Sequence, residues 1–553
     1  MLAALCLTLP IVAGLGGAVV LAGRGVSSPA GDAGWDLAGA TALLAWPGFL
    51  RSATLSLLTG GSAAALSLLL AALIVFAGGR RVGGRPGLAW LGPILAMPHA
   101  AMAFGVAFLL APSGWIARLI SPWLTGWSAP PDLATIQDPW GVALVVALVV
   151  KETPFLIATL IAATATLRAA DQLRVTAALG YARPTAAVKV LVPQVWPRLR
   201  LPFLAVLAYG IGNVDAAIVL GPTAPPTLAV QALRWARDWD VESWRSAAAA
   251  GLVLGLLVVL AFVLVVVTER VVAWLARDRL VSGGRETGAR ALTVAARAAR
   301  LALPAMAAAA VAVLAVWSVA ETWRFPDAVP TVGTRLWREI APRLAAPIGT
   351  TLGLAVAVAL LAVGLAIAAV AATTHSRSRQ AALAPVIWLP LLVPQASFVV
   401  GAQAILVALQ LDGRLAAVTL LHVVQAFPYA VLVLAGPWRA LDPRWQSTAA
   451  ALGAGPWRRL VTVRLPLMLR PLLLALAVAL AVSVDQYLTT LAAGGGRVAT
   501  LATETLALAS GGDRRVAAVH ALLQATPALL GFALALLVPA LIERRRRGLA
   551  ALT

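Results

Sequence analysis

The fold of this chain is decided by runs such as residues 247–268, which read AAAAGLVLGLLVVLAFVLVVVT and contain no charged side chain. A helix needs about 20 apolar residues to cross the hydrocarbon core of a bilayer. Of the 553 residues, 61% are hydrophobic and only 12% are charged, and the mean hydropathy is +0.91. A soluble protein of this length needs far more polar surface. The sequence therefore predicts an all-α integral membrane protein.

Runs of this kind recur along the chain, and each is expected to form one transmembrane helix. We expect twelve of them, over residues 1–23, 54–77, 88–111, 141–167, 201–221, 247–268, 301–320, 350–372, 382–411, 415–436, 469–491 and 516–542. The segments on the N-terminal side of the membrane carry about twice as many Lys and Arg as the others, including the run Arg544-Arg545-Arg546-Arg547. Basic loops stay in the cytoplasm, so we expect a bacterial inner-membrane protein with both termini cytoplasmic.

The composition also excludes several classes of function. The formal net charge of +21 is high, but the arginines lie in short loops between apolar runs. Lipid head groups and cytoplasmic proteins are therefore the expected partners, and nucleic acid is not. The chain has one cysteine, Cys6, and four scattered histidines, so no disulfide and no metal site are expected. No catalytic residue is predicted either.

The chain repeats itself on both sides of a basic linker at residues 272–300. The two halves, residues 1–271 and 301–553, each contain six expected spans. The segments that match are Thr54-Leu55 with Thr351-Leu352, Pro98 with Pro394, Pro154 with Pro428, Gly180 with Gly453, Pro193 with Pro466, Asp215 with Asp485, and Thr227-Leu228-Ala229 with Thr500-Leu501-Ala502. One shortened outer loop, residues 112–140 in the first half and 412–414 in the second, explains the change in offset. The pattern predicts a parallel internal duplication.

A short motif recurs between the fourth and fifth expected spans of each half. Residues 174–180 read RVTAALG and residues 447–453 read STAAALG, and twelve residues separate each glycine from a proline, Pro193 or Pro466. Such a pattern predicts a short helix ended by a glycine in the left-handed conformation. A second short amphipathic helix should follow, and the proline should open the next span.

These two segments resemble the EAA loops of ABC-importer permeases, in which a coupling helix docks into a cleft of the ATPase subunit. The family's glutamate position holds Arg174 in one copy and Ser447 in the other. The layout of six plus six spans resembles the fused permeases of ferric-iron and thiamine importers over essentially the whole chain. The resemblance implies coupling loops at residues 168–200 and 437–468, with contacts to the ATPase through Arg174, Ala177, Ala178, Leu179, Gly180 and Pro193, and through Ser447, Ala450, Ala451, Leu452, Gly453 and Pro466.

The ATPase itself must be a different chain. A phosphate-binding loop needs Gly-Lys followed by Ser or Thr, whereas the two lysines here, Lys151 and Lys189, each follow a valine. No cofactor is therefore expected on this chain, and ATP would be used by a partner subunit. The resemblance further implies an ABC ATPase in two copies and a periplasmic solute-binding protein that delivers the substrate.

Charged and amide side chains inside the expected spans are candidates for the translocation pathway, because such groups are costly in a membrane. The candidates are Asp215, Asp485, Lys151, Glu152, Asn213 and Gln486. Asp215 and Asp485 lie near the outer end of the fifth span of each half, where a role as helix-packing anchors is equally compatible with the sequence. Of Lys151 and Glu152, one is expected to pair with Asp215 and the other to face the pathway. Further polar residues, expected to serve mainly in helix packing, are Gln395, Gln403, His422 and Gln425.

Two other classes of protein remain possible at this point. A twelve-span secondary transporter of the major-facilitator type would carry an Asp-Arg pair among glycines, whereas residues 78–85 read GGRRVGGR without an aspartate. A membrane enzyme acting on lipid-linked substrates would need clustered acids near the interface, and residues 238–242, DWDVE, are the only such run. The transported substrate cannot be read from the sequence, since iron, thiamine, polyamine and sulfate importers share this scaffold.

Overall fold

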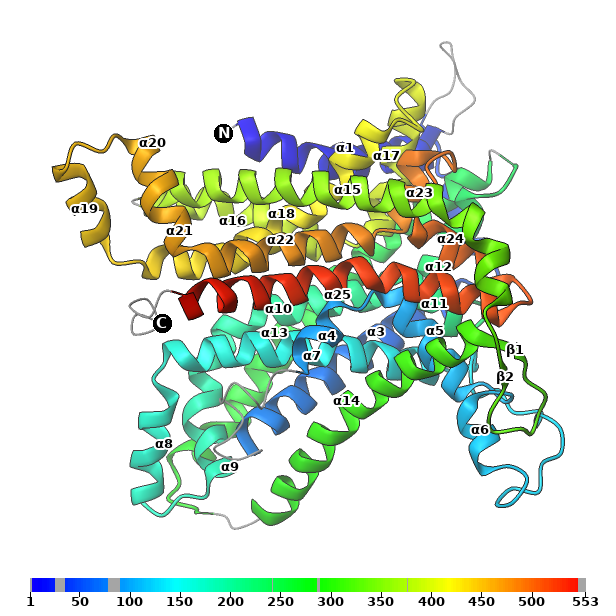
Figure 1. Cartoon of the computed structure of the whole chain (residues 1–553), viewed down its shortest axis with the longest axis horizontal. Helices are drawn as coiled ribbons and strands as arrows, with labels where there is room; N and C mark the ends of the chain where they lie inside the picture. The colour runs from blue at the N-terminus through cyan, green and yellow to red at the C-terminus, as the bar shows by residue number, and fades with distance from the viewer. Residues whose placement is uncertain are drawn as a thin grey trace.

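The computed structural model describes residues 2–24, 35–77, 90–240, 242–285, 289–374 and 376–545. The glycine-rich run at residues 78–85 and the end of the basic tail, from residue 546, lie outside the described residues. Within the described residues the regular secondary structure is helical apart from one small antiparallel hairpin, β1 (Ala320–Thr322) and β2 (Thr331–Val332). Figure 1 shows the long helices lying side by side along one direction, as expected for membrane-spanning elements.

The first half of the chain contains thirteen α-helices and two π-helical segments within the described residues. They are α1 (Leu2–Arg24), α2 (Ala38–Ala45), α3 (Phe49–Ala72), η1 (Leu73–Ala77), α4 (Leu91–Ala96), α5 (His99–Leu110), α6 (Trp115–Ile120), α7 (Val142–Thr166), α8 (Ala169–Ala178), α9 (Arg183–Ala186), η4 (Ala187–Leu191), α10 (Val192–Ile211), α11 (Asp215–Leu220), α12 (Leu228–Ala236) and α13 (Ser243–Val281).

The second half contains the β-hairpin and the remaining helices within the described residues. They are α14 (Ala289–Val319), β1 and β2, α15 (Arg335–Thr373), α16 (Arg377–Leu392), α17 (Gln395–Ala408), α18 (Leu415–Ala440), α19 (Pro443–Ala451), α20 (Pro456–Arg459), η5 (Leu460–Arg464), α21 (Leu465–Leu467), α22 (Leu469–Val484), α23 (Leu488–Gly494), α24 (Leu501–Ala507), η6 (Leu508–Ser510) and α25 (Arg514–Arg545).

The number of spans agrees with the sequence. Among the described residues, 10 helices are long and apolar enough to cross a membrane, and the number rises to 12 if each of two bent helix pairs counts as one span. The bends are 96° between α16 and α17 and 82° between residues 456–467 and 469–484. All-α architecture with about twelve spans is thereby confirmed.

One expected span end was wrong, and the expected linker is mostly helical. The basic linker at residues 272–300 stays a prediction; within its described residues it is mostly helical, because α13 continues to Val281 and α14 begins at Ala289. Arginine side chains tolerate helix well and reach water beyond the membrane surface, so the charged ends of both helices stay helical. The fifth span, expected at residues 201–221, comprises α9 to α10 and ends at Ile211.

The internal duplication is visible in matched elements and in one matched hydrogen bond. From α8 to α12 the first half corresponds to α19 to α24 at a constant offset of 273 residues. Ser56 Oγ accepts a hydrogen bond from Leu228 N at 2.9 Å, and Thr351 Oγ1 accepts one from Leu501 N at 2.8 Å. Thr351 therefore corresponds to Ser56, two positions after the expected partner Thr54.

The match of Asp215 with Asp485 is corrected in the same way. Asp215 is the first residue of α11, whereas Asp485 follows the last residue of α22. At the offset of 273, Asp485 corresponds to Gly212 and Asp215 corresponds to Leu488. The two acids lie on opposite sides of equivalent helix breaks, so one helical turn separates their positions in the repeat.

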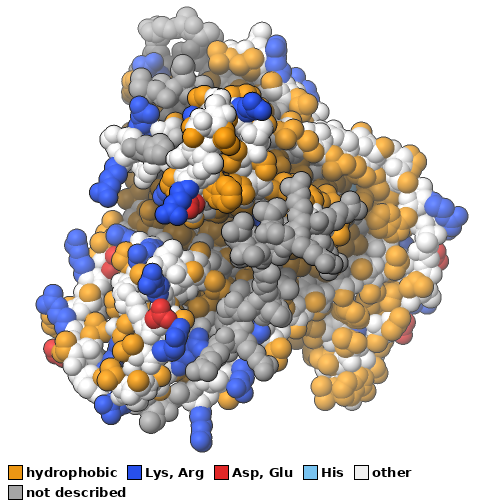
Figure 2. Space-filling view, turned by 60° about the vertical axis from the view of Figure 1, so that its left-hand side comes forward, with side chains coloured by type: hydrophobic (Ala, Val, Ile, Leu, Met, Phe, Trp, Pro, Cys, Tyr) orange, Lys and Arg blue, Asp and Glu red, His pale blue; other side chains and the backbone are white. Residues whose placement is uncertain are grey.

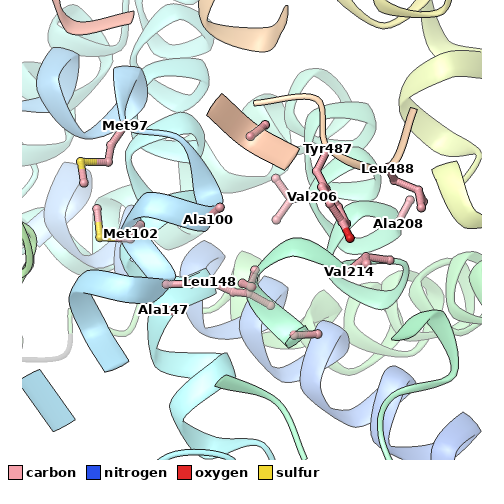
Figure 3. Packing of buried hydrophobic residues seen from close by; sticks show 14 of the residues in the cluster. Met97, Ala100, Met102, Ala147, Leu148, Val206, Ala208, Val214, Tyr487 and Leu488 are labelled. Carbon is pink, nitrogen blue, oxygen red and sulfur yellow. The ribbon is translucent and has the colours of Figure 1, made fainter. Parts of the chain in front are cut away.

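The two halves are packed together by close contacts between small residues. A Cβ atom added to Gly401 in α17 would lie 2.0 Å from the Gly14 carbonyl oxygen of α1, so only glycine permits this approach. Small residues at helix crossings are typical of membrane proteins, where close van der Waals packing drives association. The buried core extends through both halves, and Figure 3 shows Met97 and Val214 of the first half in the same cluster as Tyr487 and Leu488 of the second.

The two ends of the helix bundle differ in charge and in the elements they carry. In Figure 1, α8–α9 and α19–α20 protrude on the left, where α25 also ends, and α6 with the β1–β2 hairpin lies on the right. Figure 2, which turns the left-hand end forward, shows many Lys and Arg side chains and few acids there. The segments predicted to be coupling loops therefore share the basic end of the molecule.

Candidate functional site

Four helix breaks, two from each half, surround one cavity. Two of them lie just before the prolines Pro98 and Pro394, between α4 and α5 and between α16 and α17. The other two directly follow α10 and α22, the fifth-span helices of the two halves, at residues 212–214 and 485–487. Irregular backbone at membrane depth is tolerated where it lines a cavity. The cavity measures about 1020 Å³ and is lined by residues of both halves.

His99 joins the two halves at this cavity. Its backbone N–H donates to Asp485 Oδ1 at 2.8 Å, and its ring Nδ1 is hydrogen-bonded to Asp485 Oδ2. Its other ring nitrogen, Nε2, lies 2.9 Å from Glu152 Oε1. Carboxylate oxygens only accept hydrogen bonds, so both contacts are satisfied when both ring nitrogens carry a proton. One imidazole therefore bridges a carboxylate of α7 and a carboxylate at the end of α22.

Lys151 forms no ion pair with an acid among the described residues. Its Nζ donates to the carbonyl oxygens of Ile94 and Leu95 at 3.2 and 2.9 Å, and the residue is 8% exposed. These carbonyls belong to the last turn of α4, which ends at Ala96. The Leu95 carbonyl has lost its usual donor, because the His99 N–H bonds to Asp485, and the Ile94 carbonyl also accepts from Met97 N at 3.3 Å. Glu152, the neighbouring residue, bonds to His99 instead of to Asp215. The expected pairing of Asp215 with one member of this couple was therefore wrong.

Asp215 faces the cavity without a bonded partner. Within the described part of the chain, no donor lies within hydrogen-bonding distance of its carboxylate, although Asp485 and His99 are within electrostatic range. Asn213 holds the backbone in place, because its Oδ1 accepts from the N–H groups of Ala216 and Ala217 at 3.1 and 3.2 Å. These bonds cap the first turn of α11, and Asp215 thereby occupies the helix N-terminus, where a negative charge is favoured.

The equivalent break in the second half is closed by side-chain amides. Gln486 Oε1 accepts from Thr489 Oγ1 at 2.6 Å and from Gln395 Nε2 at 3.2 Å. Gln395 follows Pro394 just as His99 follows Pro98. In each half, the polar residue after this proline therefore bonds to the break at residues 485–487, His99 to Asp485 and Gln395 to Gln486. In the first half, a Cβ atom added to Gly212 would lie 2.7 Å from the Cβ of Pro394, so the glycine allows Pro394 to pack against this break.

The coupling segments have the predicted local structure in both halves. Gly180 and Gly453 have φ angles of +83° and +79°. The backbone N–H groups of Tyr181 and Ala454 each bond to a carbonyl five residues earlier, on Thr176 and Ala449 respectively, at 3.0 Å. This is the Schellman end of a helix, which requires a left-handed residue. The predicted left-handed glycines are confirmed.

The residues named for coupling lie on and around α8 and α19 at the basic end of the molecule. Leu179 and Leu452 are 55% and 83% exposed, and α19 has no buried residue. Arg174 is ion-paired with Asp171 at 2.7 Å on the surface of α8, and Ser447 lies on α19. Ala177, Ala178, Ala450 and Ala451 form the last turns of the two helices, and Pro193 and Pro466 lie in the first turns of α10 and α21.

Sequence reasoning missed His99, the residue that organises the cavity. It was grouped with the other scattered histidines, of which His422 indeed packs between Ser483 Oγ and Thr490 Oγ1 at 2.9 and 2.8 Å. The signal that distinguishes His99 is its place directly after the repeated proline. Tyr209 was also missed; its ring lies 4.5 Å from that of His99.

Comparisons with known proteins agree with this architecture. Residues 363–548 match the family described as binding-protein-dependent transport system inner membrane component. Over 507 residues, covering 90% of each chain, the sequence is 32% identical to the inner membrane ABC transporter permease protein YnjC of Escherichia coli. No solved structure matched the chain.

Proposed function

Because this chain belongs to the family of inner-membrane ABC transporter permeases, we propose that it forms the translocation pathway of an ATP-driven solute importer through the cavity between its two halves. As a member of that family it is a multi-pass permease subunit of the inner membrane and not an enzyme. Membership of this family does not favour the alternatives of a secondary transporter or of a membrane enzyme acting on lipid-linked substrates.

In the proposal, the chain is coupled to its ATPase through α8 and α19. One observation carries this assignment: two short helices, each ended by a left-handed glycine, protrude from equivalent points of the repeat at the same end of the molecule (Figure 1). The exposed apolar residues on and next to these helices include Val175 and Leu179 at α8, Trp445 and Leu452 at α19, and Trp457 in the following helix α20. Exposed apolar side chains next to basic ones are typical of a docking surface for another protein.

The proposal has further components that follow from it. Each helix serves one ATPase, so two ATPase copies bind, and ATP is held by those subunits alone. Residues 1–271 and 301–553 act as the two permease halves, joined through the segment 272–300. A periplasmic solute-binding protein delivers the substrate at the opposite end of the bundle, where α6 and the β1–β2 hairpin lie.

Substitutions at the two exposed leucines test the coupling surface. Leu452→Glu and Leu179→Glu place a charge on the docking surface without disturbing any buried contact, so membrane levels should stay normal. We expect the ATPase to be lost from the purified complex, and substrate-stimulated ATP hydrolysis to fall about tenfold or more, as for hot-spot residues in other interfaces. The measurement is co-purification of the co-expressed ATPase, followed by an ATPase assay in nanodiscs.

The matched control is Leu124→Glu. Leu124 is 67% exposed at the opposite end of the bundle, and this variant should retain the ATPase. If Leu452→Glu and Leu179→Glu both keep their partner and their hydrolysis, α8 and α19 are not the docking helices.

A further inference from the structure

The charged side chains around the cavity are not all paired with one another where the helix breaks meet. Its wall contains three carboxylates, those of Glu152, Asp215 and Asp485, and the cations Lys151, Arg198 and His99. His99 is shared between Glu152 and Asp485, and the Lys151 ammonium is turned onto backbone carbonyls. The Asp215 carboxyl therefore has no bonded cation in the described structure.

Arg198 is too distant to supply that cation. It is exposed, its guanidinium donates to the Gln194 carbonyl oxygen, and it lies in the second turn of α10. Between Arg198 and the end of α10 at Ile211, the helical rise alone amounts to about 20 Å. A carboxylate held inside the membrane without a partner is costly, and a positively charged solute would remove that cost.

Unpartnered polar atoms point to the same place. Asn213 Nδ2, Gln425 Nε2 and Tyr209 Oη are buried atoms without a hydrogen-bond partner in the described structure, and all three residues line the cavity. Asn213 and Gln425 are each 4% exposed. Buried polar groups normally have partners, so these donors are unsatisfied in the described structure, and a solute with hydrogen-bond acceptors would satisfy them if their side chains turned toward it.

The rest of the wall suits an organic cation better than a metal ion. The described residues contain no group of three or more His, Cys, Asp or Glu arranged to hold a metal. The cavity, at about 1020 Å³, is far larger than a bare ion, and its wall includes the aromatic residues Phe155, Trp388, Tyr429 and Phe532. Aromatic faces attract organic ammonium groups through cation–π interactions.

Resting on the proposed function, we infer that this cavity binds a small organic cation and that Asp215 receives its positively charged group. Asn213 and Gln425 would then donate to oxygen acceptors of the same solute. His99, held between the carboxylates of Glu152 and Asp485, fixes the part of the cavity wall where α4–α5, α7 and α22 meet. The inference assigns a substrate class to the pathway and gives Asp215 a role that differs from that of Asp485.

Charged thiol reagents test the charge preference of the cavity without a known substrate. In a Cys6→Ser background, Ala481→Cys places one thiol on the cavity wall, one turn before Asp485. The purified permease in nanodiscs is labelled with 2-(trimethylammonium)ethyl methanethiosulfonate or with its anionic sulfonatoethyl analogue. Each labelling rate is divided by the rate of the same reagent with a free thiol in solution. We expect this normalised rate to be about tenfold or more higher for the cationic reagent than for the anionic one.

Asp215→Asn preserves the shape of the side chain and removes its charge, so it should reduce that preference several-fold. Asp132→Asn, at an exposed residue outside the cavity, should leave it unchanged. Choline should slow the labelling, whereas isethionate, which carries the same hydroxyethyl group on an anion, should not. Equal normalised labelling rates of the cationic and anionic reagents in the Ala481→Cys protein would overturn the inference. Equal effects of choline and isethionate on labelling would do the same.

This experiment separates the inference from the proposed function. Labelling is measured on the permease alone and does not require the ATPase. A protein that prefers the cationic reagent but retains its ATPase in the Leu452→Glu and Leu179→Glu variants would contradict the coupling proposal only. A protein that loses its ATPase in those variants but shows no charge preference would contradict the cation site only.

Discussion

Gly180 and Gly453 illustrate how one residue can set the direction of an element. Each has a positive φ angle, and each ends a helix that the proposal places against the ATPase. A side chain with a Cβ in this conformation costs about 1–2 kcal/mol, and more if it is β-branched. The chain would relieve this strain by changing the angle at which α8 or α19 leaves the membrane domain.

We therefore predict that Gly180→Val and Gly453→Val uncouple transport from ATP hydrolysis. Insertion into the membrane should be normal, but the ATPase should be retained more weakly and its stimulation by substrate should fall. Gly364→Val is a matched control, because an added Cβ at Gly364 or Gly453 meets no atom within 4 Å, and only Gly453 has a positive φ. Normal coupling in both test variants would show that these glycines end their helices but do not determine how α8 and α19 contact the ATPase.

At the scale of elements, the repeat is stabilised by equivalent hydroxyl groups in α3 and α15. Ser56 and Thr351 accept the first free N–H of α12 and α24, respectively, and both hydroxyls are buried. The N–H groups at the start of a helix have no partner within the helix. Each hydroxyl therefore holds one short outer helix against a long membrane-spanning one.

Thr351→Val and Ser56→Ala should each lower the stability of the purified protein by about 1–2 kcal/mol, because a buried N–H loses its acceptor. The neighbouring variant Thr350→Val removes only a bond to the Ala346 carbonyl of its own helix on an exposed surface, so its effect should be smaller. Denaturation of the nanodisc-embedded protein, followed by tryptophan fluorescence, measures the difference. Equal effects of Thr350→Val and Thr351→Val would argue against this docking role.

At the scale of the whole molecule, the two ends of the bundle should face different compartments. The excess of Lys and Arg at the end that carries α8 and α19 (Figure 2) favours the cytoplasm for that end. The opposite end, with α6 and the β1–β2 hairpin, should face the periplasm.

Single-cysteine labelling checks this orientation in a Cys6→Ser background. In intact spheroplasts, a membrane-impermeant maleimide should modify Leu124→Cys at once and Leu452→Cys only after the membrane is permeabilised. Both side chains are more than half exposed, so accessibility alone does not separate them. Labelling of Leu452→Cys from outside would reverse the topology and remove the basis for coupling at α19.

The fold class, the span count and the form of the coupling segments followed from the sequence alone. Apolar runs of sufficient length dictate membrane helices because unpaired backbone groups cannot exist in lipid. The left-handed glycines were equally predictable, since a helix followed by glycine and a second short helix is a local pattern. Neither conclusion depends on how distant segments pack.

The register of the repeat and the chemistry of the cavity depended on tertiary structure. Asp215 and Asp485 look equivalent in the sequence, but a helix break places one at the start of α11 and the other at the end of α22. Only packing reveals that Lys151 serves α4 carbonyls and that His99 reaches Asp485, 386 residues away in the chain. Such contacts are set by which helices cross at the breaks, and hydrophobic periodicity within one helix carries no information about its partner.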